Sequence, residues 1–348
     1  MKNTAAIVCL FAVCLCRIAS AGETTVAFIP KITGNAFFES ANEGAQRYSE
    51  RIGFKVDYMG SASASPENQI AVVEEAIAGR VDAICISSVD ATALDEVLRK
   101  AVRAGIKVTT WDSDVSGDVR TVMVSQGTPE ILGEMLVEMG VKSLASRGKK
   151  PASDPIRYVW HYSQALVADQ NSWNMAGEEY IRKNYPQWIN LAPNNYYSDQ
   201  DPQKALETGE TIFESHPDID LIICNDSTAL PGQCQAAENF GKTQSDVTIT
   251  GFAAPNAIKD YCFAGIIERW GLWDNQVQGA LGCYLAYYLA GGKMIKVGDK
   301  IQVPEIGVVE VLPNTVLNPN AYVADDSGLV LLPERVEFTA QNVDKYNF

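Results

Sequence analysis

The 348-residue sequence has few of the side chains on which most catalytic and metal sites depend. It contains only two histidines, His161 and His216, which form neither an HExxH motif nor a spaced cluster with cysteines. The GxSxG, GxxxxGKS/T and GxGxxG motifs of hydrolases, P-loop proteins and dinucleotide-binding proteins are also missing. We therefore expect no enzymatic activity, no cofactor and no bound metal, with a hydrolase as the alternative that the sequence leaves open.

Positively charged residues are also scarce. The chain has 28 Lys and Arg against 43 Asp and Glu, which gives a formal net charge of −15. Nucleic acids and anionic lipid surfaces select basic proteins, so we expect neither as a partner. The simplest role of this acidity is solubility.

Long hydrophobic runs are missing after residue 22, where no stretch reaches the roughly 18 apolar residues of a membrane-spanning helix. The apolar segment 5–15 is shorter than this, follows Lys2, and precedes the small residues Ala19-Ser20-Ala21. These features are typical of a secretory signal peptide. We predict that residues 1–21 are removed and that the mature protein is exported.

Cysteine is used sparingly outside the predicted signal peptide. The mature chain keeps an odd number of scattered cysteines, at Cys85, Cys224, Cys234, Cys262 and Cys283. This pattern argues against a disulfide framework and against a CxxC metal site. Cys85 and Cys224 lie in apolar runs typical of a core, whereas Cys262 and Cys283 are candidates for one disulfide bridge.

The sequence does contain a regular alternation of short apolar runs and helical patterns. The expected strands are 24–30, 54–59, 81–87, 106–111, 121–124, 156–162, 221–224 and 247–252. The helices expected between and after them are 35–51, 66–78, 91–104, 129–144, 171–184, 202–215, 229–239 and 275–290. This alternation predicts an α/β fold with parallel sheets and helices on both faces, in two similar units.

Polar and aromatic residues follow several of the expected strands. The candidate site residues are Lys31, Phe37, Phe38, Asp112, Asp169, Gln170, Asn225, Ser227, Ala253 and Trp273. Ligands of open α/β sheets bind beyond the carboxyl ends of the strands, and a cleft between two domains is a common small-molecule site. Carboxylates and amides suit the hydroxyl groups of a polyol, while aromatic faces suit its C–H surfaces.

Each candidate also has a purely structural interpretation. Asp169 could be the N-cap of the helix expected at 171–184, and Asn225 and Ser227 could be ordinary turn residues. Lys31 could be a solvated surface residue, and the aromatic residues could belong only to the core. Their shared position at strand ends favours the ligand site.

Several longer motifs carry a resemblance to a known family. They are F-I-P-K at 28–31, T-W-D-S-D at 110–114, Q-G-T-P at 126–129, D-Q-N-S-W at 169–173, Q-A-A-E-N-F at 235–240, G-L-W-D at 271–274 and L-L-P-E-R at 331–335. With these motifs the chain resembles the periplasmic sugar-type solute-binding proteins of ABC importers. Within them it is most similar to the autoinducer-2-binding and rhamnose-binding group.

The resemblance implies a periplasmic binding protein type I fold, with two Rossmann-like domains, three hinge crossovers and an interdomain ligand cleft. The first domain is expected at 22–112 plus 271–300 and the second at 113–270 plus 301–348. The resemblance also implies a monomer that closes around its ligand and then docks on a membrane permease.

The same resemblance implies a ligand and a set of contacts. The autoinducer-2 proteins of this group hold their cyclic hydroxylated ligand with a lysine, two aspartates and a glutamine, which fall on Lys31, Asp112, Asp169 and Gln170. Asn225 and Ser227 replace a proline and an alanine of the family pattern. The implied function is import of autoinducer-2, a quorum-sensing signal. Uptake of a monosaccharide such as rhamnose or a pentose, or a sensory module that presents ligand to a receptor, are the alternatives.

Overall fold

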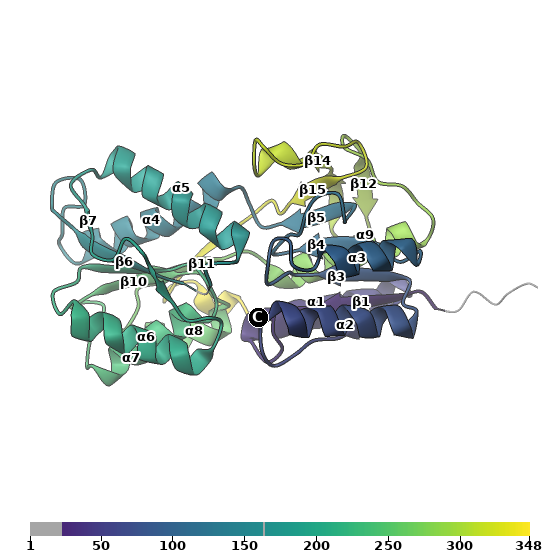
Figure 1. Ribbon diagram of the computed structural model, residues 1–348. Helices are drawn as coiled ribbons and strands as arrows, with labels where there is room; N and C mark the ends of the chain where they lie inside the picture. The colour runs from purple at the N-terminus through teal and green to yellow at the C-terminus, as the bar shows by residue number, and fades with distance from the viewer. Residues whose placement is uncertain (1–22, 163) are drawn as a thin grey trace, which may run out of the picture.

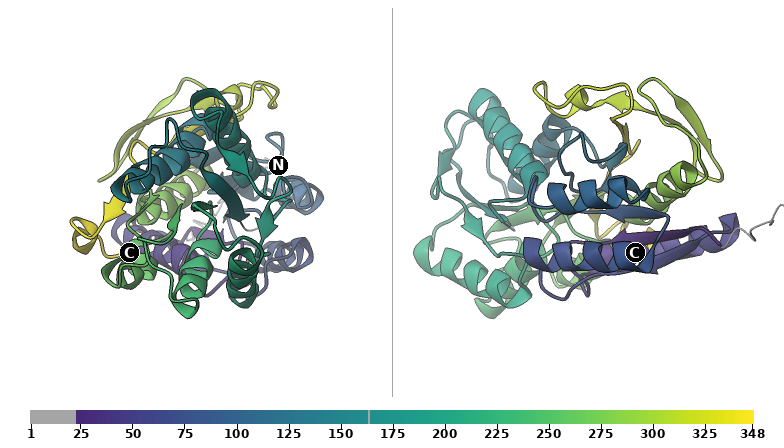
Figure 2. Two further views of the ribbon diagram at one scale, coloured as in Figure 1. Left: turned by 90° about the vertical axis from the view of Figure 1, so that its left-hand side faces the viewer. Right: turned by 45° about the vertical axis from the view of Figure 1, so that its right-hand side comes forward.

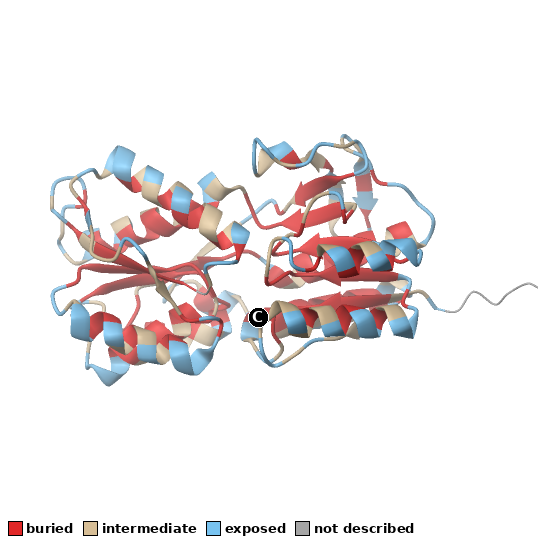
Figure 3. Ribbon diagram, in the orientation of Figure 1, coloured by how far each residue is buried: buried red, intermediate tan, exposed pale blue. Residues whose placement is uncertain are grey.

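The computed structural model describes residues 23–162 and 164–348, so the predicted signal peptide at 1–21 lies outside the described residues. Two sheets stand next to each other, and each is covered by helices on both faces (Figure 1). The central strands of both sheets are buried, whereas the outer faces of the helices are exposed (Figure 3). No helix of this part of the chain combines the length and the apolar character needed to cross a bilayer.

The first sheet has seven strands in the order β14-β15-β5-β4-β3-β1-β2. Their bounds are β1 (Thr25–Ile29), β2 (Lys55–Tyr58), β3 (Ala83–Ile86), β4 (Lys107–Trp111), β5 (Val122–Ser125), β14 (Leu312–Pro313) and β15 (Gly328–Leu331). All pair in parallel except β14 with β15. One face packs on α1 (Ala36–Ile52) and α9 (Asn275–Ala290), the other on α2 (Pro66–Gly79) and α3 (Asp95–Arg103).

The second sheet has five parallel strands, in which β10, β9, β6 and β7 follow one another and β8 also pairs with β6. Their bounds are β6 (Arg157–Tyr162), β7 (Ile189–Asn190), β8 (Tyr196–Tyr197), β9 (Leu221–Cys224) and β10 (Thr248–Gly251). The helices α4 (Pro129–Ser146) and α5 (Ala168–Asn184) cover one face (Figure 1). The other face carries α6 (Pro202–Ser215), α7 (Ala229–Asn239) and α8 (Pro255–Phe263).

The chain passes between the two sheets three times. It leaves the first sheet after β5, returns after β11 (Arg269–Leu272) to form α9, and leaves again after β15. The last segment forms β16 (Val336–Thr339), which pairs antiparallel with β11. A hairpin of β12 (Lys300–Val303) and β13 (Gly307–Glu310), with the short helices η1 (Asn314–Val316) and η2 (Val343–Lys345), completes the fold (Figure 2).

Strand pairing does not match the expected domain boundaries at 112 and 300. β5 pairs with β4, and β14 and β15 extend the same sheet, although 113–126 and 301–331 were expected in the second domain. The alternating pattern predicts where a strand lies but not which sheet it joins. The chain therefore leaves the first sheet one strand later than predicted, near Gln126.

Local capping explains most helix starts. Ser65, Thr128 and Asp201 accept hydrogen bonds from the first turns of α2, α4 and α6, each just before a proline at the first helical position. α5 differs, because it begins at Ala168 and its N-cap position is Val167. The expectation that Asp169 caps a helix starting at 171 is therefore wrong, and its carboxylate is available for other contacts.

The predicted bridge between Cys262 and Cys283 is also wrong. All five cysteines of the described residues are free and buried. Cys283 of α9 lies against Cys85 of β3, and burial together with this contact raises the pKa of the Cys283 thiol. Cys262 belongs to α8 on the other sheet, so the two helices hold these thiols apart.

Candidate functional site

The carboxyl ends of strands from both sheets meet at one place. Lys31 follows β1, Asp112 follows β4 and Asn225 follows β9, and all three line one cavity between the units. This is the position at which open α/β sheets bind ligands. The fold thus gathers the expected polar residues from segments that are far apart in sequence.

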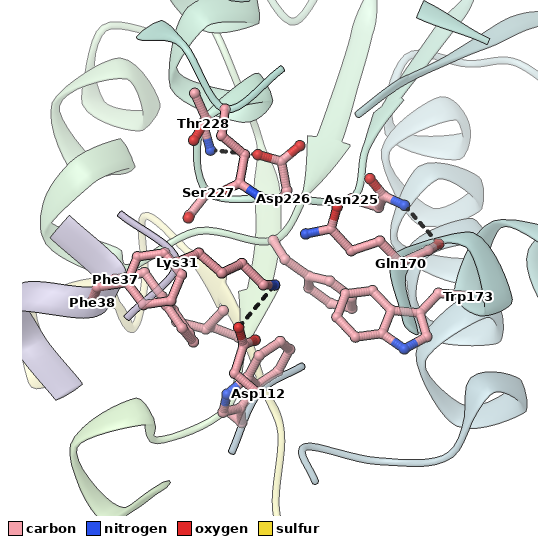
Figure 4. A pocket seen from close by; sticks show the side chains of 14 residues that line it. Lys31, Phe37, Phe38, Asp112, Gln170, Trp173, Asn225, Asp226, Ser227 and Thr228 are labelled. Atoms are coloured by element: carbon pink, nitrogen blue, oxygen red, sulfur yellow. Dashed lines mark hydrogen bonds and ion pairs between the residues drawn. The ribbon is translucent and has the colours of Figure 1, made fainter. Parts of the chain in front are cut away.

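The cavity has a volume of about 380 Å³ and mixes aromatic and polar walls (Figure 4). It is lined by Lys31, Phe37, Phe38, Asp112, Gln170, Trp173, Gln200, Asn225, Asp226, Ser227, Thr228, Phe252, Leu272 and Trp273.

Two of the polar lining residues, Lys31 and Asp112, form a buried ion pair. Lys31 Nζ lies 3.0 Å from Asp112 Oδ2, and the Lys31 side chain is only 2% exposed. Ser87 Oγ donates a hydrogen bond of 2.6 Å to the same carboxylate. Burial alone would lower the pKa of Lys31, but the carboxylates of Asp112 and Asp169 outweigh it and the pKa is raised. Lys31 is therefore a buried cation that presents N–H donors beside the cavity.

The backbone turns sharply at Asp112, which has a φ of 58° in the left-handed region. Aspartate tolerates this conformation better than most residues, yet it is uncommon and clusters at functional sites. The turn sends neighbouring side chains to different partners. Asp112 reaches Lys31, whereas Ser113 reaches Asp169 in the second unit.

Asp169 lines a second, larger cavity of about 1210 Å³ and not the one lined by Lys31 and Asp112, although the charges of both residues act on it. Its two carboxylate oxygens accept hydrogen bonds from Ser113 Oγ at 2.8 and 2.9 Å. Burial raises the pKa of Asp169 to about 6, with Lys31 opposing and Asp112 adding to the rise. The contact between Ser113 and Asp169 joins the two units.

A second carboxylate, Asp226, lines the ligand cavity and was not among the predicted site residues. Its Oδ1 accepts hydrogen bonds from the backbone N–H groups of Thr228 at 2.7 Å and Ala229 at 3.1 Å. Its Oδ2 has no partner among the described residues. Burial raises the pKa of Asp226 to about 6, although these backbone hydrogen bonds and Lys31 oppose the rise.

Four lining residues carry buried polar atoms without a hydrogen-bond partner among the described residues. They are Gln170 Oε1, Gln200 Nε2, Asn225 Oδ1 and Asp226 Oδ2. Buried polar atoms are nearly always partnered in proteins, so such a concentration indicates a place where a ligand or water supplies the bonds. Three of the four are acceptors, which need hydrogens such as those of hydroxyl groups.

The apolar wall is a cluster of aromatic rings. Phe37 stacks on Trp111 with an interplanar angle of 8° and meets Trp273 edge to face at 78°. Trp273 in turn contacts Trp173 and Phe252 edge to face. Rings held in this way offer rigid apolar surfaces to the C–H groups of a small ligand.

Most predicted site residues line the cavity, and two do not. Asp169 lines the second cavity instead, and Ala253 is buried next to the sheet, where its N–H donates to Gly271 O at 3.2 Å. The lining residues missed in the sequence are Trp173, Gln200, Asp226, Thr228, Phe252 and Leu272. Trp173, Asp226 and Thr228 lie within or beside the segments that follow predicted strands, so they could have been included. Gln200 lies in a loop that no predicted strand precedes directly.

Comparison with known proteins gives a consistent family. The family described as periplasmic binding protein domain matches residues 26–294, which is most of the chain. The structure is similar to that of LsrB from Clostridium saccharobutylicum in complex with AI-2, with 61% sequence identity and a TM-score of 0.93. That match covers 93% of this chain and all of the other.

Two more distant relatives share the architecture. An ABC transporter solute binding protein from Clostridium phytofermentas with bound L-rhamnose is 21% identical, with a TM-score of 0.81 over 93% of this chain and 98% of its own. The ribose import binding protein RbsB of Salmonella typhimurium is 25% identical over 314 residues, which span 87% of this chain and 95% of that protein. The chain therefore belongs to the periplasmic binding protein domain family, with the type I α/β architecture that its motifs imply.

Proposed function

We propose that this chain is the solute-binding component of an ABC importer and that it captures autoinducer-2 (AI-2) in the cavity between its two sheets. The observation that carries the proposal is the 61% identity, over 93% of the chain, to a protein whose structure contains AI-2. Lys31, Asp112 and Gln170 line the cavity, which supports the same site here, whereas Asp169 lines the second cavity.

The chemistry of the cavity supports a neutral, hydroxyl-rich ligand. Asp226 Oδ2, Asn225 Oδ1 and Gln170 Oε1 are acceptors that find no hydrogen-bond partner within 23–162 and 164–348, and hydroxyl groups supply the hydrogens that they lack. A carboxylate has no such hydrogens at neutral pH, and either a carboxylate or a phosphate would be repelled by the carboxylates of Asp112 and Asp226. The buried Lys31 is already paired with Asp112, which further disfavours an anionic ligand.

A monosaccharide is the second candidate, favoured by one departure from the family pattern. Asn225 and Ser227 stand where the pattern has proline and alanine, and both line the cavity. Asn225 Nδ2 donates to Gln170 O at 3.1 Å, so its side-chain amide is oriented with Oδ1 as the spare acceptor. This added acceptor would suit one more ligand hydroxyl.

We further propose that the protein is exported through the signal peptide at 1–21 and works in the periplasm. The sheets suggest two domains, 23–126 with 275–331 and 127–272 with 336–348, that close around ligand by a hinge motion. A membrane permease would then receive the ligand chemically unchanged. The alternative of a sensory module would be favoured by an adjacent sensor-kinase gene, and import by adjacent permease and ATPase genes.

Thermal unfolding of the mature protein with a ligand panel tests the proposal. The panel contains the AI-2 precursor with and without borate, ribose, rhamnose and other pentoses and hexoses. A ligand present at about 100 times its dissociation constant should stabilise the protein by about 2.7 kcal/mol. NMR spectra of the recovered ligand would show whether it is unchanged, as a binding protein requires.

We expect a shift with the AI-2 precursor that disappears in Asp112→Ala. Lys204→Ala, on the exposed side of α6, is the control and should keep the shift. A shift with one sugar and none with the AI-2 precursor would replace the ligand but keep the binding role. A protein that responds to no member of the panel would contradict both candidates.

A further inference from the structure

One side chain, Asn35, connects the two units at the edge of the ligand cavity. It precedes α1, and its Oδ1 accepts a hydrogen bond of 2.9 Å from the backbone N–H of Phe37, which caps the helix. The same oxygen accepts from Ser227 Oγ at 3.2 Å, while Asn35 Nδ2 donates to Thr228 Oγ1 at 3.2 Å. Ser227 and Thr228 belong to the turn between β9 and α7 of the second unit.

We propose that Asn35, Ser227 and Thr228 form a latch that stabilises the closed arrangement of the two units, and that the Ser227 hydroxyl serves this latch rather than ligand recognition. This inference rests on the proposed binding function but not on the identity of the ligand. It gives a role to one of the two positions at which the chain departs from the family pattern.

The hydrogen-bond inventory of the latch supports this role. A serine hydroxyl has one hydrogen, and Ser227 donates it to Asn35 Oδ1, so the hydroxyl cannot also donate to a ligand. The orientation of the Asn35 amide is fixed independently, because the N–H of Phe37 requires the oxygen on that side. Thr228 Oγ1 then accepts from the amide nitrogen, and every polar atom of the Asn35 side chain is engaged.

The position of the latch couples it to binding. Ser227 and Thr228 line the cavity, as do Phe37 and Phe38, which directly follow Asn35. Asn35 is only partly buried, so in an open form water can replace its partners at little cost. Bonds that exist only in the closed state shift the equilibrium toward that state and so strengthen the apparent affinity for any ligand that requires closure.

The effect should be modest and should appear in dissociation. One hydrogen bond between neutral groups has a net contribution that corresponds to roughly two- to tenfold in an equilibrium constant. Since the latch holds the closed form, its loss should speed ligand release more than it slows association. Because the latch bonds join protein groups to one another, their loss should weaken the binding of every compound by the same factor.

Three variants separate the latch from the other roles of its residues. Ser227→Ala removes one latch bond, and Ser227→Ala with Thr228→Val removes both. Asn35→Ser keeps a good helix cap for α1 but is too short to span the cleft. Asn42→Ser is the matched control, since Asn42 lies on the same helix, outside the cavity, and accepts only from Gln46 within that helix.

Dissociation constants and release rates of every panel compound that the wild type binds are measured by calorimetry and by stopped-flow tryptophan fluorescence. We expect a two- to tenfold weakening in Ser227→Ala, and an equal, larger loss in Asn35→Ser and in the double variant. Combining Asn35→Ser with the double variant should add nothing further. Asn42→Ser should match the wild type, and the ligand-free melting temperature of Asn35→Ser should be unchanged.

Two results would overturn the latch. If Ser227→Ala changes the order of ligand preference or gains a new ligand, the hydroxyl contacts ligand. If affinity and release rate stay at wild-type values, the bonds contribute nothing to closure. A wild type that binds no panel compound would contradict the proposed function instead. The latch is then decided on ligand-free protein by single-molecule fluorescence energy transfer between dyes on the two units, which counts the closed fraction. An Asn35→Ser variant with the same closed fraction as wild type would reject the latch.

Discussion

At the scale of single residues, the buried ion pair of Lys31 and Asp112 leads to a specific prediction about the free energy of unfolding. Removing one partner of a buried ion pair leaves an uncompensated charge and typically costs 3–5 kcal/mol, whereas replacing both can be nearly neutral. We expect Asp112→Ala to lower the free energy of unfolding by about 3 kcal/mol, since Asp169 and Asp226 still attract Lys31. Adding Lys31→Met should restore stability but not ligand binding. Urea unfolding of both variants checks this, and equal losses in the two would contradict it.

The raised pKa of Asp169 makes stability depend on pH. The pKa is about 6 in the folded protein, against roughly 3.9 in an unfolded chain. The folded state therefore holds the proton more tightly, and this contribution to stability is present in full below about pH 4 and is lost as the pH rises through 6. A shift of about two units corresponds to about 3 kcal/mol.

Asp169→Asn should remove that dependence. The free energy of unfolding, measured with urea at pH 4.5 and pH 7, should fall less across this interval in the variant than in wild type. Every other titrating group is common to both proteins and cancels in the comparison. An unchanged pH profile would mean that Asp169 titrates near its ordinary value in the folded protein.

Some residues of the candidate site could be predicted from the sequence, and others could not. Lys31 and Asp112 were predictable because each directly follows an apolar strand, and parallel strands end at one edge. Gln200 was not, since it reaches the cavity from a loop in which Asp199 and Gln200 have φ of 52° and 57°. Neither residue is a glycine, so the sequence gives no indication that the backbone adopts the left-handed conformation here.

At the scale of elements, α4 and α5 pack closely because a glycine allows it. A Cβ added to Gly133 would lie 2.6 Å from Gly177 N and from Trp173 O, both backbone atoms. Gly133→Ala should therefore separate the helices and cost about 1–3 kcal/mol of unfolding free energy. Trp173, which lines the ligand cavity, would move with α5, so ligand affinity should also fall.

Gly79 provides the control for this substitution. It also lies in a helix, α2, but a Cβ there would meet nothing within 4 Å. Gly79→Ala should leave stability unchanged or raise it by up to about 1 kcal/mol, since alanine loses less backbone entropy on folding. Thermal and urea unfolding of the two variants compare the sites, and similar effects at both would refute the close-packing argument.

The first residue of a helix could be predicted where a capping side chain and a proline stand next to each other in the sequence. Pro66, Pro129 and Pro202 follow capping side chains and fixed the beginnings of α2, α4 and α6. α5 begins three residues before its predicted start at 171 because Val167 precedes it without a side-chain cap. The sheet to which each strand belongs was harder to predict from the sequence, because the pairing of β5 with β15 joins segments about 200 residues apart.

At the scale of the whole molecule, side chains tie the three crossings to one another. Arg335 Nε donates to Gln126 O at 2.7 Å and its guanidinium also bonds Leu332 O at 2.8 Å. Gln278 Nε2 donates to Gln126 Oε1 at 3.0 Å, and Trp273 Nε1 donates to Gln278 Oε1 at 2.6 Å. These links should limit the hinge to one axis of movement.

Arg335→Ala should loosen this hinge. We expect faster amide hydrogen exchange at 126–128 and 332–335, and a loss of about 1–3 kcal/mol of unfolding free energy, because hydrogen bonds to charged groups are removed. Arg182→Ala is the matched control, since Arg182 is exposed and its one ion-pair partner in the described part of the chain is Glu179, an exposed pair that should contribute little to stability. Exchange that rises equally in both variants would count against the hinge assignment.

The interleaved first sheet also has a consequence for how the chain folds. Its edge beyond β5 is completed only by β15, whose residues Gly328–Leu331 come near the end of synthesis. Pairings between such distant segments carry a large loop-closure entropy and slow folding. The second sheet, by contrast, takes all its strands from the single stretch 157–251 and can form earlier. A nascent chain that completes its N-terminal sheet last stays unfolded longer at that end, which is compatible with the export proposed above.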